Sequence, residues 1–225
     1  NRGLKEKNEI ENFLNPDYQK TTHDPFLFND MAAAIELIVA HVKKKNKIVV
    51  YGDYDADGVT AAAVLLETLK TLRAKVDVYI PNRVSEGYGL NKKAIDEIID
   101  MEVKLIITVD GGIRNKEEVD YAKELGLDVV VTDHHIPPLK EEMPNCLIIN
   151  PIVAGENYPF KYLAGVGVAF KLAKALIGKS KLAEEDKKKI EERVLDLAAI
   201  GTVADCVSLL GENRILVKNG LDVLN

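Results

Sequence analysis

From residue 47 onward, short apolar runs alternate along the chain with longer stretches of helical periodicity. The short runs are rich in Val and Ile, which favour strands, and they are apolar almost throughout rather than at every second position. Strands of this kind are buried on both faces, as in a parallel sheet covered by helices. The predicted strands are KIVVYGD (47–53), KVDVYIP (75–81), KLIITVD (104–110), DVVVTD (128–133) and CLIINP (146–151).

The connecting and following stretches are predicted to be helical. VTAAAVLLETLKTL, KKAIDEIIDM and KEEVDYAKELG lie between the strands, and helices are expected after Pro151 over 162–178, 184–200 and 212–224. Strand–helix alternation predicts an α/β fold: a doubly wound five-stranded parallel sheet with helices on both faces, followed by a helical region. We expect one domain over 47–225, with the sheet ending near 151, and an N-terminal extension (1–46) that packs on it through a helix at 31–45.

Composition narrows the class of protein. With 225 residues, 47% of them hydrophobic, the chain is long enough to bury a core without disulfide or metal staples. The net charge of -6 argues against a protein that holds nucleic acid by bulk charge. No apolar run approaches the roughly 20 residues of a spanning helix, and no signal-peptide layout is present, so we expect no membrane association and a cytoplasmic location. Cys146 and Cys206 are read as reduced core residues.

Acidic residues and histidines follow three of the predicted strands. In an open α/β sheet, ligands bind in the crevice beyond the carboxyl ends of the strands, so these side chains are expected to lie together in that crevice. Any one of the aspartates could instead cap the helix that follows it. Together they would repel one another and raise their own pKa values unless a cation neutralised them. The residues are Asp53, Asp55 and Asp57 after the first strand, Asp110 after the third, and Asp133, His134 and His135 after the fourth.

Carboxylate oxygens with imidazole favour Mn²⁺ or Mg²⁺ over a thiolate-rich zinc site, and the number of ligands suggests two ions. The stretch DYDADG is not a calcium loop, because Val64 stands where an EF-hand requires glutamate. Asp205, set among apolar residues in GTVADCVSL, is either a further ligand or a helix N-cap.

Four motifs in this order, DYDADG, VDGG, DHH and GTVADCVSL, resemble the DHH phosphoesterase superfamily. Within it, flanking segments along nearly the whole chain resemble the RecJ family of single-strand-specific exonucleases. The resemblance implies a hydrolase that degrades single-stranded DNA from 5′ to 3′ into mononucleotides during DNA repair and recombination. It also implies DHHA1-type and OB-type domains that clamp the substrate, and we find neither in this sequence.

The resemblance further implies roles for individual residues. Asp55 would serve one ion, with Asp53 as an extra ligand where related pyrophosphatases place a histidine at the position of Tyr51. Asp57, His134 and Asp205 would hold the second ion. Asp110 would bridge the two ions, and His135 would face the scissile phosphate as the second catalytic residue.

Substrate contacts are expected from three side chains, each with a plainer alternative. Arg83 and Tyr88 in RVSEGYGL would bind phosphate and stack on a base, unless the segment is only a glycine-rich turn. Arg114 would contact phosphate or form a surface salt bridge. The small residues at 164, 165 and 167 in LAGVGVAFKLAKAL either admit a close backbone approach or serve helix packing.

Two other functions are considered from the residues alone. A DHH phosphodiesterase or phosphatase for small nucleotides, such as nanoRNA or cyclic dinucleotides, would share the metal motifs. A receiver-type signalling module would also have five parallel strands and an acidic pocket, but it requires a lysine after the fifth strand, where this chain has Asn150 and Pro151.

Overall fold

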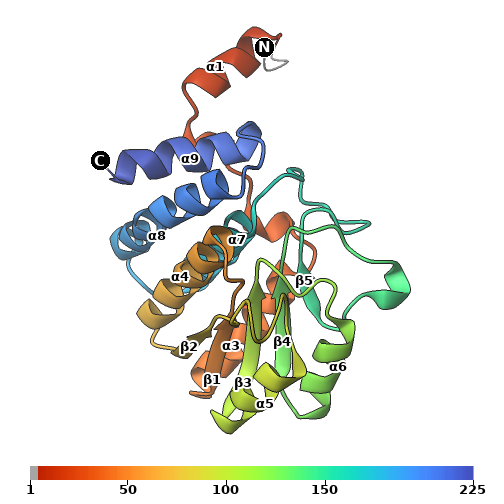
Figure 1. Ribbon diagram of the computed structural model, residues 1–225. Helices are drawn as coiled ribbons and strands as arrows, with labels where there is room; N and C mark the ends of the chain where they lie inside the picture. Colours follow the sequence, from red (N-terminus) through yellow and green to blue (C-terminus); the bar gives the residue numbers. More distant parts are fainter. Residues whose placement is uncertain (1–4, 225) are drawn as a thin grey trace.

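The sheet has five parallel strands, as the sequence predicts. The structure, a computed structural model, describes residues 5–224 (Figure 1). The strands lie in the order β2-β1-β3-β4-β5, so the chain winds outward from β1 in both directions and β3 is central. Their bounds are Lys47–Tyr51 (β1), Lys75–Tyr79 (β2), Val103–Val109 (β3), Asp128–Thr132 (β4) and Leu147–Ile149 (β5).

Two apolar cores lie on opposite faces of this sheet. Ile48, Val50 and Ile107 belong to the core shared with α3 (Met31–Lys43), α4 (Ala56–Thr71) and α7 (Gly165–Lys179). Val49 and Ile106, the neighbours of those residues, belong to the core shared with α5 (Lys92–Asp100) and α6 (Lys116–Glu124). Successive strand residues point to opposite faces, so apolar side chains at consecutive positions are what a sheet covered on both sides requires.

The helical region forms a further layer. Helix α8 (Glu184–Ala204) packs on α4 and α7, and α9 (Gly211–Leu224) packs on α8 (Figure 1). Helix α8 continues four residues past the predicted end at 200, and α7 begins at 165 rather than 162. After α8 the chain turns at Cys206, which has a positive φ of 61°.

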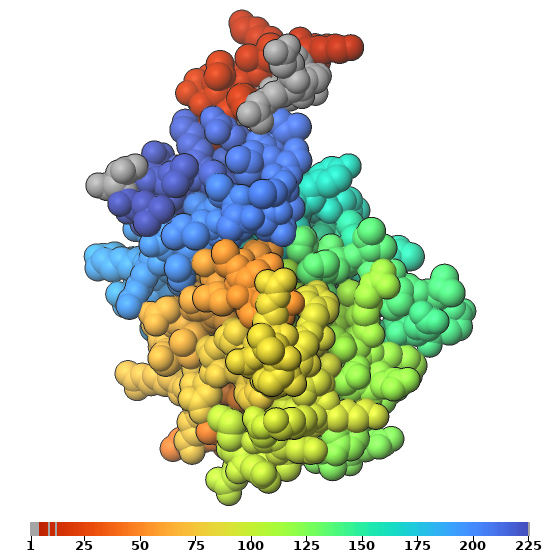
Figure 2. Space-filling view, in the orientation of Figure 1, coloured from red at the N-terminus to blue at the C-terminus, as the bar shows by residue number. Residues whose placement is uncertain are grey.

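The N-terminal residues follow a path along the helical layer before they reach the sheet. Helix α1 (Lys7–Leu14) stands above α9 (Figures 1 and 2), and Arg214 and Lys218 of α9 donate to the carbonyl groups of Phe13 and Leu14. The short helices α2 (Tyr18–Thr21) and η1 (Pro25–Leu27) lead to α3, which lies against the sheet. The remaining short helix is η2 (Lys140–Glu142).

Within residues 5–224, no single helix has the length and apolar character needed to cross a bilayer. The segments Tyr18–Leu27 and Met31–Lys43 meet that test only together, and they are bent by 78° at the break between them. The interpretation of both cysteines as core residues is wrong for Cys206, which is exposed, while Cys146 is partly buried; neither forms a disulfide in the described part of the chain.

Candidate metal centre

The carboxyl ends of three neighbouring strands bring acidic and imidazole side chains together. Strands β1, β3 and β4 lie side by side, so the residues that follow them share one edge of the sheet. Asp205 joins them from the end of α8, which packs on α4. Three groups of side chains, each with ligand atoms within 4.8 Å of one another, result: Asp53, Asp55 and Asp110; Asp57, His134 and Asp205; and Asp110, His134 and His135.

Local backbone structure holds the first group. Asp55 is the N-cap of α4, and its Oδ1 accepts a hydrogen bond from the Gly58 amide at 2.9 Å. Gly58 itself lies against Asp53, because a Cβ at Gly58 would come within 2.7 Å of the Asp53 backbone. Asp55 therefore caps a helix and also faces Asp53 and Asp110, so the two interpretations of this aspartate are compatible.

The second group draws on residues far apart in sequence. Asp57 lies in the first turn of α4 and is only 1% exposed. His134 Nε2 lies 3.8 Å from Asp57 Oδ2, and His134 Nδ1 lies 3.8 Å from Asp205 Oδ2. Asp205 is the C-cap residue of α8, with its amide donating to the Gly201 carbonyl at 2.9 Å, so the alternative interpretation as an N-cap is wrong.

Asp110 stands between the two groups. It follows the central strand β3 and is 2% exposed, with a positive φ of 56° that aspartate tolerates better than most residues. Its Oδ1 lies 3.2 Å from His134 Nε2, yet neither atom has a hydrogen-bond partner among the described residues, and the same holds for Oδ2 of Asp205. Buried polar atoms without partners are rare, and three of the four such side-chain atoms among the described residues belong to these groups, the fourth being Asn213 Oδ1. Their concentration here fits a site for an ion.

The pKa values of these groups reflect the crowding. Burial, reinforced by the charge of Asp110, raises the pKa of Asp57 to about 7. Burial also raises the pKa of Asp110 to about 6, against the lowering effect of His134. Burial lowers the pKa of His134, but the carboxylates of Asp110, Asp57 and Asp205 together outweigh it and raise this pKa to about 9. Ionising these neighbouring carboxyl groups is therefore unfavourable in free energy, and a bound divalent cation would offset that cost. Carboxylates with one imidazole are a donor set that fits Mn²⁺ or Mg²⁺.

Asp133 orients His135. The sequence places Asp133 at the carboxyl end of the fourth strand but assigns it no functional role. Its Oδ1 accepts hydrogen bonds from the His135 amide at 3.0 Å and from His135 Nδ1 at 2.8 Å. Its Oδ2 accepts one from the Ile113 amide at 3.0 Å. Burial would raise the pKa of Asp133, but the hydrogen bonds from His135 outweigh it and lower this pKa, while they raise the pKa of His135. Position in the motif does not reveal this, because a ligand and an orienting carboxylate look alike in sequence.

The three predicted substrate-binding residues lie around this edge of the sheet, and each makes a different contact there. The exposed Tyr88 ring meets His135 edge-on at 6.0 Å between centroids. Arg83 stacks over Tyr54 at 5.0 Å and acts electrostatically on Asp53. Arg114 donates through Nε to the Ile136 carbonyl at 3.1 Å, where a salt bridge was the alternative.

Tyr51, at the position where related pyrophosphatases place a histidine, belongs to none of the three groups. Its hydroxyl donates to the Gly89 carbonyl at 3.0 Å and receives a hydrogen bond from Asn91 at 3.3 Å.

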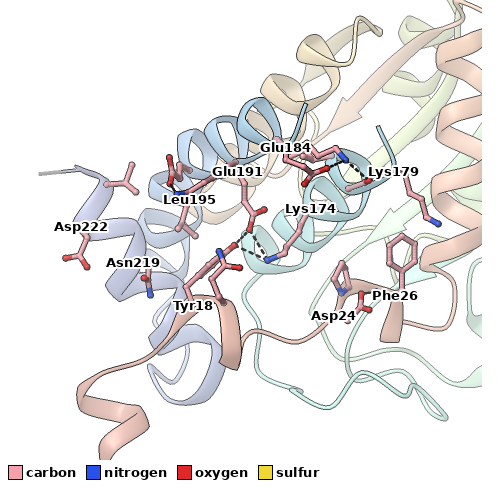
Figure 3. Close-up of a pocket in the computed structure, with 18 residues that line it drawn as sticks. Tyr18, Asp24, Phe26, Lys174, Lys179, Glu184, Glu191, Leu195, Asn219 and Asp222 are labelled. Atoms are coloured by element: carbon pink, nitrogen blue, oxygen red, sulfur yellow. Dashed lines mark hydrogen bonds and ion pairs between the residues drawn. The ribbon is translucent and has the colours of Figure 1, made fainter. Parts of the chain in front are cut away.

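A larger cleft of about 980 Å³ lies elsewhere, between the N-terminal segment and the helices α7, α8 and α9 (Figure 3). None of the candidate ligands lines it. Several of its charged groups pair with one another: Lys174 lies 2.9 Å from Glu191, which also accepts from the Tyr18 hydroxyl, and Lys187 lies 2.7 Å from Glu184. The chemistry is therefore concentrated at the sheet edge and not in the larger space.

The comparisons with known proteins agree with this geometry. The DHH family, N-terminal domain, matches residues 47–202. The single-stranded-DNA-specific exonuclease RecJ of Bacillus subtilis is 49% identical over 203 residues, which cover 90% of this chain and 24% of that protein. The protein of the same name from Escherichia coli is 40% identical over 199 residues, covering 84% of this chain and 33% of that one. The chain thus spans about a quarter to a third of these curated relatives.

Solved structures give the same result. A crystal structure of exonuclease RecJ bound to manganese superposes with a TM-score of 0.77 at 37% identity, over 87% of this chain and 48% of that one. RecJ from Thermus thermophilus in complex with Mn²⁺ gives 0.73 at 35% identity, over 87% of this chain and 27% of that one. The strand order is also common in other doubly wound proteins, receiver modules included, so the sequence similarity is what separates them. The family match covers more than half of the chain, and the chain therefore belongs to the DHH family.

Proposed function

We propose that this chain is the catalytic part of a metal-dependent phosphodiesterase that removes nucleotides from the 5′ end of single-stranded DNA, in DNA repair and recombination. The observation that carries the proposal is the set of buried ligand-type atoms, on Asp110, His134 and Asp205, that have no hydrogen-bond partner among the described residues. They lie where two divalent ions, Mn²⁺ or Mg²⁺, would replace the missing partners.

The three groups suggest how the ions would be shared. Asp53, Asp55 and Asp110 would hold one ion. Asp57, His134 and Asp205 would hold the other, with Asp110 as the bridge because it belongs to the first group and lies 3.2 Å from His134. Bound there, divalent ions neutralise the carboxylates, polarise the phosphoryl group and lower the pKa of water.

The residues themselves would orient the substrate and move a proton. His135 is partly exposed, and Asp133 holds its Nδ1, so Nε2 is the ring nitrogen left to meet the substrate. A proton held at Nε2 would stabilise the charge on the scissile phosphate and then pass to the leaving oxygen. The raised pKa of His135, caused by its hydrogen bond to Asp133, favours the protonated ring near neutral pH.

Single-stranded DNA is the substrate that the relatives' names support, since the Bacillus subtilis and Escherichia coli proteins are single-stranded-DNA-specific exonucleases. Arg83 and Arg114 offer cations at the rim for backbone phosphates, and Tyr88 offers an exposed ring beside His135 on which an unpaired base can stack. A net charge of -6 means that binding depends on these local contacts and not on bulk charge.

The proposal also divides the chain into a catalytic unit and an N-terminal extension. Residues 47–225 would form the catalytic unit and residues 1–46 an extension, with α3 as its attachment to the sheet. In relatives three to four times as long, further domains of the same polypeptide would clamp the strand. The unpaired cysteines agree with a cytoplasmic location.

The test is hydrolysis in the presence of Mn²⁺ of single-stranded DNA labelled at the 5′ or the 3′ end, of the matching duplex and of a dinucleotide. We expect labelled mononucleotide to appear first from the 5′-labelled single strand, with no product from the duplex. Asp110→Asn should give no product in any arm, and metal removal should have the same effect. Preferred cleavage of the dinucleotide would replace the proposal by the small-nucleotide alternative, and an active Asp110→Asn variant would remove the metal centre from the mechanism.

A further inference from the structure

Helix α7 begins without a side-chain cap of its own. Its N-cap residue is Ala164, and no side chain within the cap accepts from the first turn. The first amides of a helix have no intrahelical acceptor and need one from elsewhere. Here the Gly165 amide donates to Asp57 Oδ2 at 2.6 Å, and the Val166 amide donates to Asp57 Oδ1 at 2.8 Å. Both oxygens of a candidate metal ligand, 108 positions earlier in the chain, are thus held by this helix start.

Gly165 also lies directly against Asp110. A Cβ at Gly165 would come within 2.5 Å of Asp110 Oδ1 and 2.6 Å of Asp110 Cβ, closer than such atoms approach in proteins. The other glycines of α7 are different: a Cβ at Gly167 would lie 3.2 Å from its nearest neighbour, on Leu163, and one at Gly178 would meet nothing within 4 Å. The close approach is therefore specific to the first residue of the helix and to a carboxylate.

Helix α8 closes the same site from another side. A Cβ at Gly201 would come closest to Thr60 Oγ1 and would lie 2.8 Å from Val166 Cγ1 and 3.1 Å from Asp57 Oδ1. Thr60 and Val166 are helix-packing partners of Gly201, and Asp57 is the carboxylate beside it; the Asp110 carboxylate is the partner of Gly165. Asp57 is therefore held by the amides of Gly165 and Val166, and Asp110 lies against Gly165. Both acids are positioned by the same helix start.

We propose that the first turn of α7 is a positioning element for the metal centre and that Gly165 is its positioning residue. The inference rests on the proposed function, since it assigns to the helix the task of setting two ligands for a divalent ion. Two amide donors keep the Asp57 carboxylate from rotating, and the positive end of the helix dipole favours its charged form. The missing side chain at Gly165 lets Asp110 reach the position next to it. The ligands are then ordered before an ion arrives, so ion binding loses less conformational entropy.

The experiment compares Gly165→Ala with the matched variant Gly178→Ala on the same helix, at a temperature where circular dichroism shows both to be folded. Titration calorimetry with Mn²⁺ should show about 10–100-fold weaker binding for Gly165→Ala, as is typical when a residue that orients a ligand is changed. Gly178→Ala should bind within about twofold of the unchanged protein, because its Cβ meets nothing. A merely structural glycine would lower the melting temperature and leave the Mn²⁺ affinity of the folded protein unchanged.

Equal Mn²⁺ affinities for Gly165→Ala and the unchanged protein would overturn the inference while leaving the proposed function intact. Failure of the unchanged protein to bind Mn²⁺ would instead overturn the proposed function. If Gly165→Ala does not fold, amide NMR of the unchanged protein decides the matter. The Gly165 and Val166 amides should be protected from exchange and should shift when Mg²⁺ is added; exchange at the rate of exposed amides, or no shift on saturation, would refute the positioning role.

Discussion

Replacing Asp110 by asparagine should stabilise the metal-free protein while abolishing hydrolysis. Asp110 is buried, and its pKa is about 6 in the folded chain against an ordinary 3.8. Ionising this carboxyl therefore costs folding free energy. The cost begins as the pH rises above 3.8, where the unfolded chain loses its proton first, and it is complete once the pH has passed through about 6. Asparagine has nearly the same shape and carries no charge, so it avoids that cost.

The magnitude follows from the pKa difference. About two pKa units correspond to roughly 3 kcal/mol, a net figure that already includes the attraction to His134, so we expect a gain of up to about 3 kcal/mol at pH 8 and almost none at pH 4. For a chain of this size, a gain of about 3 kcal/mol would raise the melting temperature by about 6–12 °C. The assay is urea and thermal unfolding by circular dichroism in the presence of a chelator, at both pH values.

Asp110→Ala is the informative control, because residue 110 has a φ of 56°. Alanine in this left-handed region costs about 1–2 kcal/mol that asparagine avoids. The alanine variant should therefore be less stable than the asparagine variant although both are inactive. An asparagine variant that is no more stable at pH 8 than the unchanged protein, or equally stabilised at pH 4, would refute the reasoning that burial makes this carboxylate costly.

Three further predictions concern neighbouring features. Because burial raises the pKa of Asp57 to about 7, its proton must leave before an ion binds; Mn²⁺ affinity by calorimetry should rise at least about tenfold from pH 6 to pH 8, and a constant affinity would contradict this. Asp133→Asn should lower kcat more than it weakens Mn²⁺ binding, since it removes the charged acceptor of the His135 ring but reaches a proposed ligand only through the backbone amide of His134; equal losses in both would make Asp133 part of the metal site instead. Lys171→Met should cost about 3–5 kcal/mol in urea unfolding, because it leaves the buried Glu212 carboxylate without its cation; a double variant that also carries Glu212→Gln should recover most of that loss.

The sequence was sufficient to predict the five strands of the sheet and the acidic and histidine residues that lie together at its edge. Val- and Ile-rich runs set the five strands, and consecutive apolar positions such as Val49 and Val50 fit a sheet with a core on each face. The rule that ligands lie beyond the carboxyl ends of parallel strands then brought Asp53, Asp110 and His134 to one place. These inferences succeed because strand propensity and alternation are local properties that a short segment expresses by itself.

Local patterns were less informative at the ends of helices. The small residues at the start of α7 left two possibilities open, and Asp205 was compatible with an N-cap as well as with a ligand. Helix ends depend on what lies beside them, because their unpaired amides and carbonyls are satisfied by whichever group the fold brings near. For α7 that group is the carboxylate of Asp57.

What the sequence by itself determined is the list of chemical groups, their order along the chain and the sheet that carries them. Only the tertiary structure decided which groups face one another: that Asp133 holds His135, that the Tyr51 hydroxyl donates to the Gly89 carbonyl, and that Gly165 contacts both Asp57 and Asp110. The physical reason is that Tyr51 and Gly89 lie 38 positions apart and Asp57 and Gly165 lie 108 positions apart, so packing brings them together and no local pattern encodes their distances, while Asp133 could face His135 or an ion until the fold set its direction.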